Sequence, residues 1–119
     1  MQAPKTNLKR ERQVADILKA IKAYDLTSSS AWSALDVLSS HTFLDGVEVD
    51  PDGIIVKGKD FRGPISVYVV LKYSEPNEDK FETSDSFMGE FDGHFDEQEK
   101  PVIDHVIVDT SPFFEGEQA

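Results

Sequence analysis

Cysteine is absent from the 119 residues, so disulfides, thiolate catalysis and cysteine-ligated zinc sites are excluded. Long apolar runs are absent too: none approaches the ~20 residues that a membrane helix needs, and the opening stretch MQAPKTNLKRERQ lacks the apolar centre of a secretory signal. We therefore expect a cytoplasmic protein without membrane contact. Gly-rich phosphate loops and a G-x-S-x-G motif are also missing, and no catalytic residue can be assigned.

Basic residues are scarce and unevenly placed. The chain holds 12 Lys and Arg against 23 Asp and Glu, for a net charge of -11. Residues 1–24 contain six basic and two acidic groups (+4), so the remaining 95 residues carry -15. Such an acidic body repels nucleic acid and anionic membranes. We therefore expect a basic protein surface as the partner and no direct nucleic-acid binding.

Two helices are predicted in the N-terminal third. A helix over about 7–25 is indicated by apolar residues at i, i+3, i+4 and i+7, namely Val14, Ile17, Leu18 and Ile21. A shorter helix over about 29–39 follows a run of serines and carries Ala31, Leu35 and Leu38 on one side. The basic first helix is expected to dock on its own sheet, and the alternative is that it contacts an acidic partner.

From residue 42 onward the apolar period changes to two, which is typical of strands. Five strands are predicted, at about 43–50, 54–59, 64–73, 86–96 and 101–110. The turn-forming sequence DPDG favours a hairpin over 46–59, and the polar stretch 74–85 favours a loop. The predicted fold is α+β, a single domain over 1–119 with two N-terminal helices packed on one face of an antiparallel meander. Residues 1–6 and 115–119 are expected to fray.

The stretch EFDGHFDE, Glu90 to Glu97, is the most chemically suggestive part of the chain. Phe and Gly alternate with acids and a histidine, so the aromatic side chains are expected to point inward and the polar ones outward. If Phe95 faces Val102 across the following turn, Asp92 faces His105. The simplest interpretation is a solvated sheet face whose charges oppose edge-to-edge aggregation.

The favoured functional interpretation is a small acidic interaction domain without enzymatic activity or cofactor. Its contacts with a basic partner would come from five acidic residues, Glu48, Asp50, Glu90, Asp92 and Asp96. A homodimer through a free sheet edge is also compatible with this fold.

Two alternatives stay open. One is a metal-dependent hydrolase or nuclease in which a divalent cation, or an acid/base pair, uses Asp92, His94, Asp96 and His105. The other is a small-ligand site between helices and sheet, lined by Trp32, Tyr68 and the inward phenylalanines.

The C-terminal half also carries a family resemblance. Residues 46–115, with VEVDPDG, SVYVVLKY and SDSFMGEFDGHFDEQEKPVIDHVIVDTSPFFE, resemble the β-rich part of predicted pPIWI-associating nucleases of bacteria and phages. Most of this likeness lies in the G-H-x-D-E turn and in the final V-D-T-S-x-F-x-E segment. The resemblance implies a bacterial or phage origin, and the family's name implies nuclease activity.

Overall fold

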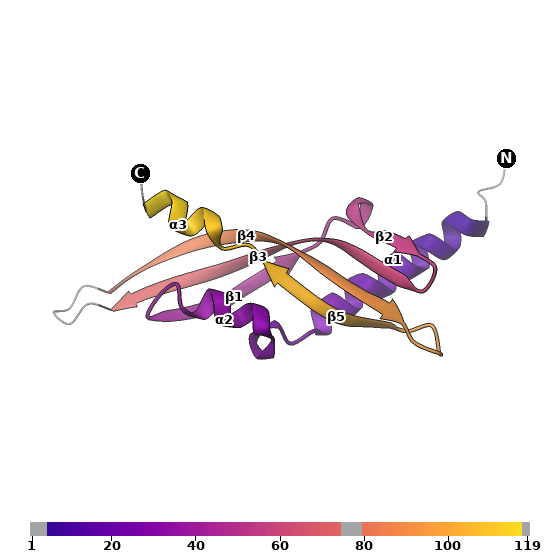
Figure 1. Cartoon of the computed structure of the whole chain (residues 1–119), viewed down its shortest axis with the longest axis horizontal. Helices are drawn as coiled ribbons and strands as arrows, with labels where there is room; N and C mark the ends of the chain where they lie inside the picture. Colours follow the sequence, from indigo (N-terminus) through magenta and orange to yellow (C-terminus); the bar gives the residue numbers. More distant parts are fainter. Residues whose placement is uncertain (1–4, 75–79, 118–119) are drawn as a thin grey trace.

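The computed structural model of the chain describes residues 5–74 and 80–117. The order of elements is α1 (Lys5–Ala23), η1 (Leu26–Ser28), α2 (Ser30–Asp36), β1 (His41–Glu48), η2 (Pro51–Gly53), β2 (Ile55–Lys57), β3 (Asp60–Ser74), β4 (Lys80–Phe95), β5 (Pro101–Val108) and α3 (Ser111–Glu117). The strands form one antiparallel sheet, and the N-terminal helices pack against it (Figure 1). The predicted α+β class is confirmed.

The predicted hairpin over 46–59 is wrong. The sheet order is β1-β3-β4-β5, and β2 pairs with β3 on the edge that β1 also uses. β1 pairs along Ser66–Lys72 and β2 along Asp60–Arg62, so both strands lie end to end beside the long β3. The DPDG segment is a 3-10 turn that connects them in line, and the Asp50 side chain accepts a hydrogen bond from the Asp52 amide. The reversal of the chain instead falls at Gly58, which has a positive φ of 63°.

The predicted loop over 74–85 is wrong in part. β4 already begins at Lys80 and pairs continuously with β3 from Ser74↔Lys80 to Asp60↔His94. The residues 75–79 lie outside the described part of the chain. The polar side chains of this stretch misled the prediction, because pairing with an apolar neighbouring strand decides strand formation more strongly than local propensity does.

The hydrophobic core lies between the helices and one face of the sheet. The predicted stripe of α1 is buried there, with Val14, Ile17 and Ile21 at most 5% exposed. From the sheet come the alternating residues Ile65, Val67, Val69 and Leu71 of β3 and Phe87, Phe91 and Phe95 of β4. The predicted inward phenylalanines are thus confirmed. Full burial of each such side chain contributes about 1.5–3 kcal/mol.

A third helix, α3, was not predicted. Its start is marked by Asp109, whose carboxylate accepts a hydrogen bond from the Ser111 amide, and by Pro112 in its first turn. Phe113 packs against the core, with its ring centroid 6.5 Å from that of Phe87. Helical geometry therefore extends into both terminal stretches that were expected to fray; residues 1–4 and 118–119 lie outside the described part. None of the described helices is long and apolar enough to span a membrane.

Candidate functional site

The face of the sheet opposite the helices is called the open face here. Its residues alternate with the buried ones along each strand and include Ser66 and Tyr68 of β3, Met88, Glu90 and Asp92 of β4, and Ile107 of β5. Large apolar side chains are exposed on it, with Met88 at 63% and Ile107 at 68%. Glu48 of β1, paired with Ser66, brings a further carboxylate to this face. The open face thus combines exposed apolar side chains with acidic ones.

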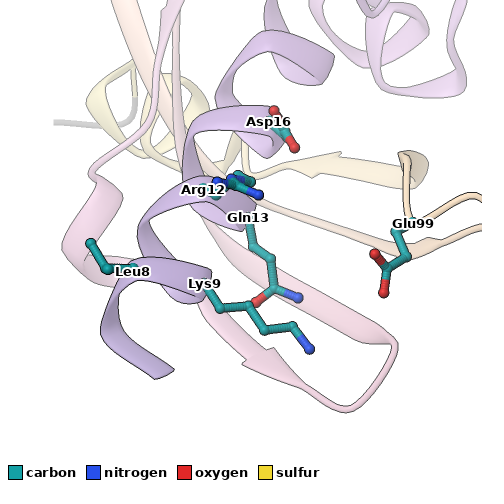
Figure 2. A pocket seen from close by; sticks show the side chains of 6 residues that line it. All are labelled: Leu8, Lys9, Arg12, Gln13, Asp16 and Glu99. Atoms are coloured by element: carbon teal, nitrogen blue, oxygen red, sulfur yellow. The ribbon is translucent and has the colours of Figure 1, made fainter. Parts of the chain in front are cut away.

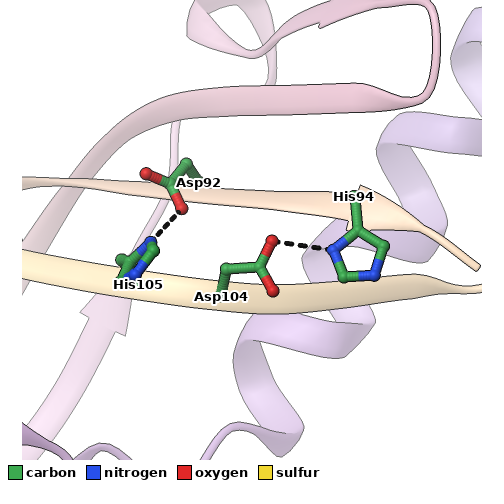
Figure 3. Close-up of polar contacts among 4 residues, drawn as sticks. All are labelled: Asp92, His94, Asp104 and His105. Carbon is green, nitrogen blue, oxygen red and sulfur yellow. Dashed lines mark hydrogen bonds and ion pairs between the residues drawn. The ribbon is translucent and has the colours of Figure 1, made fainter.

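Two Asp–His pairs join β4 to β5 on the open face (Figure 3). His105 Nδ1 lies 2.8 Å from Asp92 Oδ1, and His94 Nδ1 lies 2.7 Å from Asp104 Oδ2. In the first pair the aspartate lies on β4 and the histidine on β5, whereas in the second pair the histidine lies on β4 and the aspartate on β5. The expected Asp92–His105 pairing is confirmed, and the partner of His94 is Asp104, which the sequence did not single out.

A β-bulge produces the second pair. The register of β4 and β5 shifts between Asp92 and Gly93, so Phe95 faces Pro101 and His94 faces Val102. The register expected from the turn, with Phe95 facing Val102, is therefore wrong by one residue. The bulge leaves Asp104 without a Cα partner and lets its side chain reach His94. Gly93 is required beside it, because a Cβ there would overlap the carbonyl oxygen of Val102.

The aspartates orient both imidazole rings. In each pair Nδ1 faces the carboxylate, and among the described residues no hydrogen bond involves Nε2. An aspartate that receives Nδ1–H fixes the tautomer and leaves Nε2 available to a ligand. The hydrogen bond from Asp104 raises the pKa of His94 above its usual value, and the charges of Asp104, Asp60 and Asp96 act in the same direction.

A hollow of about 740 Å³ adjoins the two pairs, and we call it the paired-histidine hollow. Its charged lining comes from Lys57, Asp60, Arg62, Asp92, Asp104 and His105. Arg62 of β3 is the cross-strand partner of Asp92, so Arg62, Asp92 and His105 follow one another across three strands. His94 is joined to the hollow through Asp104.

Two of the predicted acidic residues have local structural roles. Asp96 accepts hydrogen bonds from the amides of Gln98 and Lys100 in the β4–β5 turn, and these bonds lower its pKa. Asp50 closes the turn between β1 and β2. Glu48, Glu90 and Asp92 remain together on the open face.

The four residues considered for a metal are not brought into one group. Asp92 and His105 form one pair, His94 binds Asp104, and Asp96 belongs to the turn. Within 5–74 and 80–117, no three His, Asp or Glu side chains are gathered in a way that could hold a metal ion.

The proposed ligand pocket of Trp32, Tyr68 and the phenylalanines does not form. Trp32 packs against the core on the helix side, whereas Tyr68 lies on the open face, between the fully buried Val67 and Val69 in the chain. A cavity of about 240 Å³ does lie between α1 and the sheet. It is lined by other residues, including Tyr24, Leu44 and Val47.

A second hollow of about 440 Å³ lies between α1 and the β4–β5 turn. Lys9 and Gln13 extend from the helix toward the space into which Glu99 points (Figure 2). Arg10 nearby donates to the Ile54 carbonyl at 2.8 Å. Thus part of the basic face of α1 is used to dock the helix on its own sheet.

These features define a two-layer α+β domain whose sheet has one covered and one open face. The chain belongs to the family of predicted pPIWI-associating nucleases, whose family model matches residues 7–114. Comparisons with curated proteins and with solved structures gave no significant match.

Sequence reasoning missed Asp104, Asp60 and Arg62 as neighbours of the paired histidines. The signal for Asp104 was present, since Asp104-His105 lies opposite a strand glycine that marks bulges. Arg62 and Asp60 could not be placed, because the chain reversal was assigned to DPDG and not to Gly58.

Proposed function

We propose that this chain is an interaction domain that docks through its open face on a basic surface of a pPIWI protein. The family description supplies the partner class. The observation that carries the proposal is the uncovered sheet face, on which Glu48 and Glu90 accompany the exposed side chains of Tyr68, Met88 and Ile107.

The composition of this face suits a protein partner. Protein interfaces combine a desolvated centre, enriched in Tyr and Met, with a polar rim. Here Tyr68 and Met88 supply apolar area, and the carboxylates supply complementarity to Lys and Arg. Such charges raise the association rate and make binding sensitive to salt.

The test is the affinity of the purified chain for the pPIWI protein of the same genome at low and high salt. Replacing Glu48 and Glu90 by Lys is expected to weaken binding by about tenfold or more, since each reversal places like charges together. The matched control is Asp36→Lys, an exposed reversal on α2. If the open-face variant and Asp36→Lys change the affinity equally, or if binding is insensitive to salt, the open face is not the interface.

The outer edge of β5 offers a second kind of contact. β5 is the last strand in the sheet order of the described residues, so a homodimer could form by adding strands there. Sedimentation equilibrium over a wide concentration range tests this proposal. A single monomer mass at all concentrations would overturn it.

A second candidate function is a nuclease or other hydrolase acting at the paired-histidine hollow. Two observations favour it. His105 lines the hollow together with Arg62, and within the described part of the chain no hydrogen bond involves its Nε2. The family is also described as one of predicted nucleases. Imidazoles held by carboxylates are suited to general acid and base catalysis.

The test of this candidate is cleavage of labelled single- and double-stranded DNA and RNA, with EDTA or with magnesium, manganese, zinc or calcium. Melting temperatures with the same ions, for wild type and Asp92→Ala, test the metal-dependent version separately. A ligand bound only by the native state stabilises it by about 2.7 kcal/mol at a hundredfold excess over its Kd. No cleavage of any substrate under any of these conditions would remove the candidate.

A further inference from the structure

We propose that the outer side of β4 between Glu82 and Ser86, called here the free edge of β4, is a strand-addition site for an extended basic segment of a partner protein. The site is a backbone edge of the sheet and not one of its faces, so the inference goes beyond the docking function proposed above. The observations that carry it are the place where β5 ends, the regular pairing of β4 and the charge of the exposed stretch.

β5 accompanies only part of β4. β4 (Lys80–Phe95) pairs with β3 along its whole length, whereas β5 pairs with it only from Gly89 to Phe95. The chain after β5 makes one further backbone hydrogen bond to β4, from the Asp109 amide to the Met88 carbonyl oxygen at 2.9 Å, and then enters α3. Within the described part of the chain, the outer side of β4 before Met88 therefore has no neighbouring strand.

The backbone groups that point outward can be assigned from this last hydrogen bond. In an antiparallel sheet, the hydrogen-bonding groups of successive residues alternate between the two neighbouring strands. Because the Met88 carbonyl faces the side of β5, the backbone groups of Ser86, Ser84 and Glu82 face that side too. The Ser86 amide donates to Asp85 Oδ1 at 2.8 Å. Among the described residues, no backbone hydrogen bond reaches Glu82 or Ser84 from the outer side, so their donors and acceptors are available to an added strand.

The free edge of β4 lacks two devices that commonly protect sheet edges, namely bulges and prolines. The pairing of β4 with β3 has no register shift, and residues 80–88 contain no proline. β1, by contrast, is interrupted between Leu44 and Gly46. The residues 82–86 are exposed, while the neighbouring α3 packs on the core through Phe113 (Figure 1). The free edge is thus both regular and accessible.

The charges of this stretch indicate the occupant. Residues 82–86, ETSDS, carry two carboxylates and no basic group. Glu82 forms an ion pair with Lys72 of β3 at 3.7 Å, whereas Asp85 has no ion-pair partner among the described residues. Opposite charges on facing strands stabilise a sheet, and like charges destabilise it. Because Glu82 and Asp85 are three positions apart, we expect Lys or Arg at the same spacing in the added strand.

A second copy of this chain is a poor occupant of the same edge. Pairing the free edges of two copies would bring Glu82 and Asp85 of both into one strand pair, so four carboxylates would share the contact. Like charges placed together select against a wrong partner. The free edge therefore favours a basic strand over self-association, and the homodimer considered above uses β5 instead.

The added strand is expected to run antiparallel to β4, in line with β5. Antiparallel pairs are slightly more stable per residue than parallel ones. The sheet already contains such an arrangement, since β1 and β2 lie end to end beside β3. In strand addition, main-chain hydrogen bonds supply the affinity and side chains supply the specificity.

The experiment is an NMR titration of the full ¹⁵N-labelled chain with a synthetic extended peptide, TVTKVTKVT, and with its acidic counterpart TVTEVTEVT. The amide signals of Glu82, Ser84 and Ser86 should shift with the Lys peptide. Two further Lys peptides carry N-methyl groups at alternate residues, in one frame or in the other. The frame whose N–H groups face β4 should lose affinity by about tenfold or more, because those hydrogen bonds cannot form. The other frame should bind like the unmethylated peptide.

Variants of the chain test the same edge from the protein side. Ser84→Pro removes an outward N–H, and proline is tolerated on the solvent side of edge strands, so this variant should fold but lose peptide binding. Asp85→Lys should weaken binding by about tenfold or more. Asp36→Lys, the exposed reversal on α2, should leave it unchanged. The dispersion of the amide spectrum checks that each variant folds, and the methylated peptides test the edge without altering the chain.

Shifts at the free edge of β4 that depend on the methylation frame and on the charge of the peptide would support the inference. Equal binding of both methylated frames, or shifts confined to the open face, would overturn it by showing attraction to an acidic surface alone. Equal binding of the acidic peptide would overturn the choice of a basic occupant. No binding of the Lys peptide at millimolar concentration would overturn strand addition, while leaving docking through the open face untouched.

Discussion

Neighbouring residues of β4 illustrate the difference between the two faces of the sheet. Phe87 and Phe91 are 3% and 1% exposed, whereas Met88 between them is 63% exposed. The covered face is filled by apolar side chains from α1, α2, β3 and β4. The open face carries carboxylates, paired histidines and isolated apolar groups. Stability therefore resides on one face, and the surface available for function lies on the other.

The largest expected effect comes from truncating one side chain on each face. Phe91→Ala removes a ring from the core and is expected to destabilise the fold by about 3–5 kcal/mol. Met88→Ala removes an exposed side chain and should change stability by at most about 0.5 kcal/mol. Urea unfolding of both variants measures the contrast, and comparable losses would refute the assignment of the two faces.

A smaller loss is expected at the bulge. Gly93→Ala places a Cβ against the Val102 carbonyl oxygen and the Phe61 ring, and overpacking of this kind costs about 1–3 kcal/mol. At Gly46, a Cβ meets nothing within 4 Å, so Gly46→Ala is the matched control. In thermal unfolding, the Tm values of wild type and Gly46→Ala should both be well above the Tm of Gly93→Ala. A Gly93→Ala protein as stable as the control would mean that the strands do not approach as described.

The pairing of His94 with Asp104 predicts a pH dependence of stability. Because the pKa of His94 is raised in the folded protein, its contribution is fully present below the ordinary value of 6.5. The contribution is lost as the pH rises through the folded pKa. The Tm advantage of wild type over His94→Gln should therefore be larger at about pH 5.5 than at about pH 9.

The smallest expected effect is a shift in the titration midpoint of His94. Asp104→Asn should lower the NMR titration midpoint of His94, since the main cause of its raised pKa is the Asp104 hydrogen bond. Asp45→Asn, an exposed change on β1, should leave that midpoint where it is in wild type. If Asp104→Asn has no effect, the pair is not formed in solution.

The sequence predicted which strand residues are buried, but it did not predict which strands pair. Period-two alternation assigned Phe87, Phe91 and Phe95 to the core correctly, because burial on one face is encoded residue by residue. Pairing is not encoded locally, so DPDG was mistaken for a hairpin turn although β3 accommodates β1 and β2 end to end.

The candidate site was predicted only in part. Asp92–His105 was found from strand register, whereas His94–Asp104 depends on a bulge that shifts the register by one residue. Arg62 lies in the hollow because β3 pairs with β4, although Arg62 is far from Asp92 in the sequence. Cross-strand neighbours of this kind require the pairing of the whole sheet.

The most direct test of the open face as a docking surface is hydroxyl-radical footprinting of the chain, free and bound to the pPIWI protein. Met88 and Tyr68 are exposed on that face, and Phe114 is an exposed aromatic residue of α3 that serves as an internal reference. The account predicts that Met88 and Tyr68 lose reactivity in the complex while Phe114 keeps it. Protection of Phe114 with unchanged Met88 and Tyr68 would contradict it.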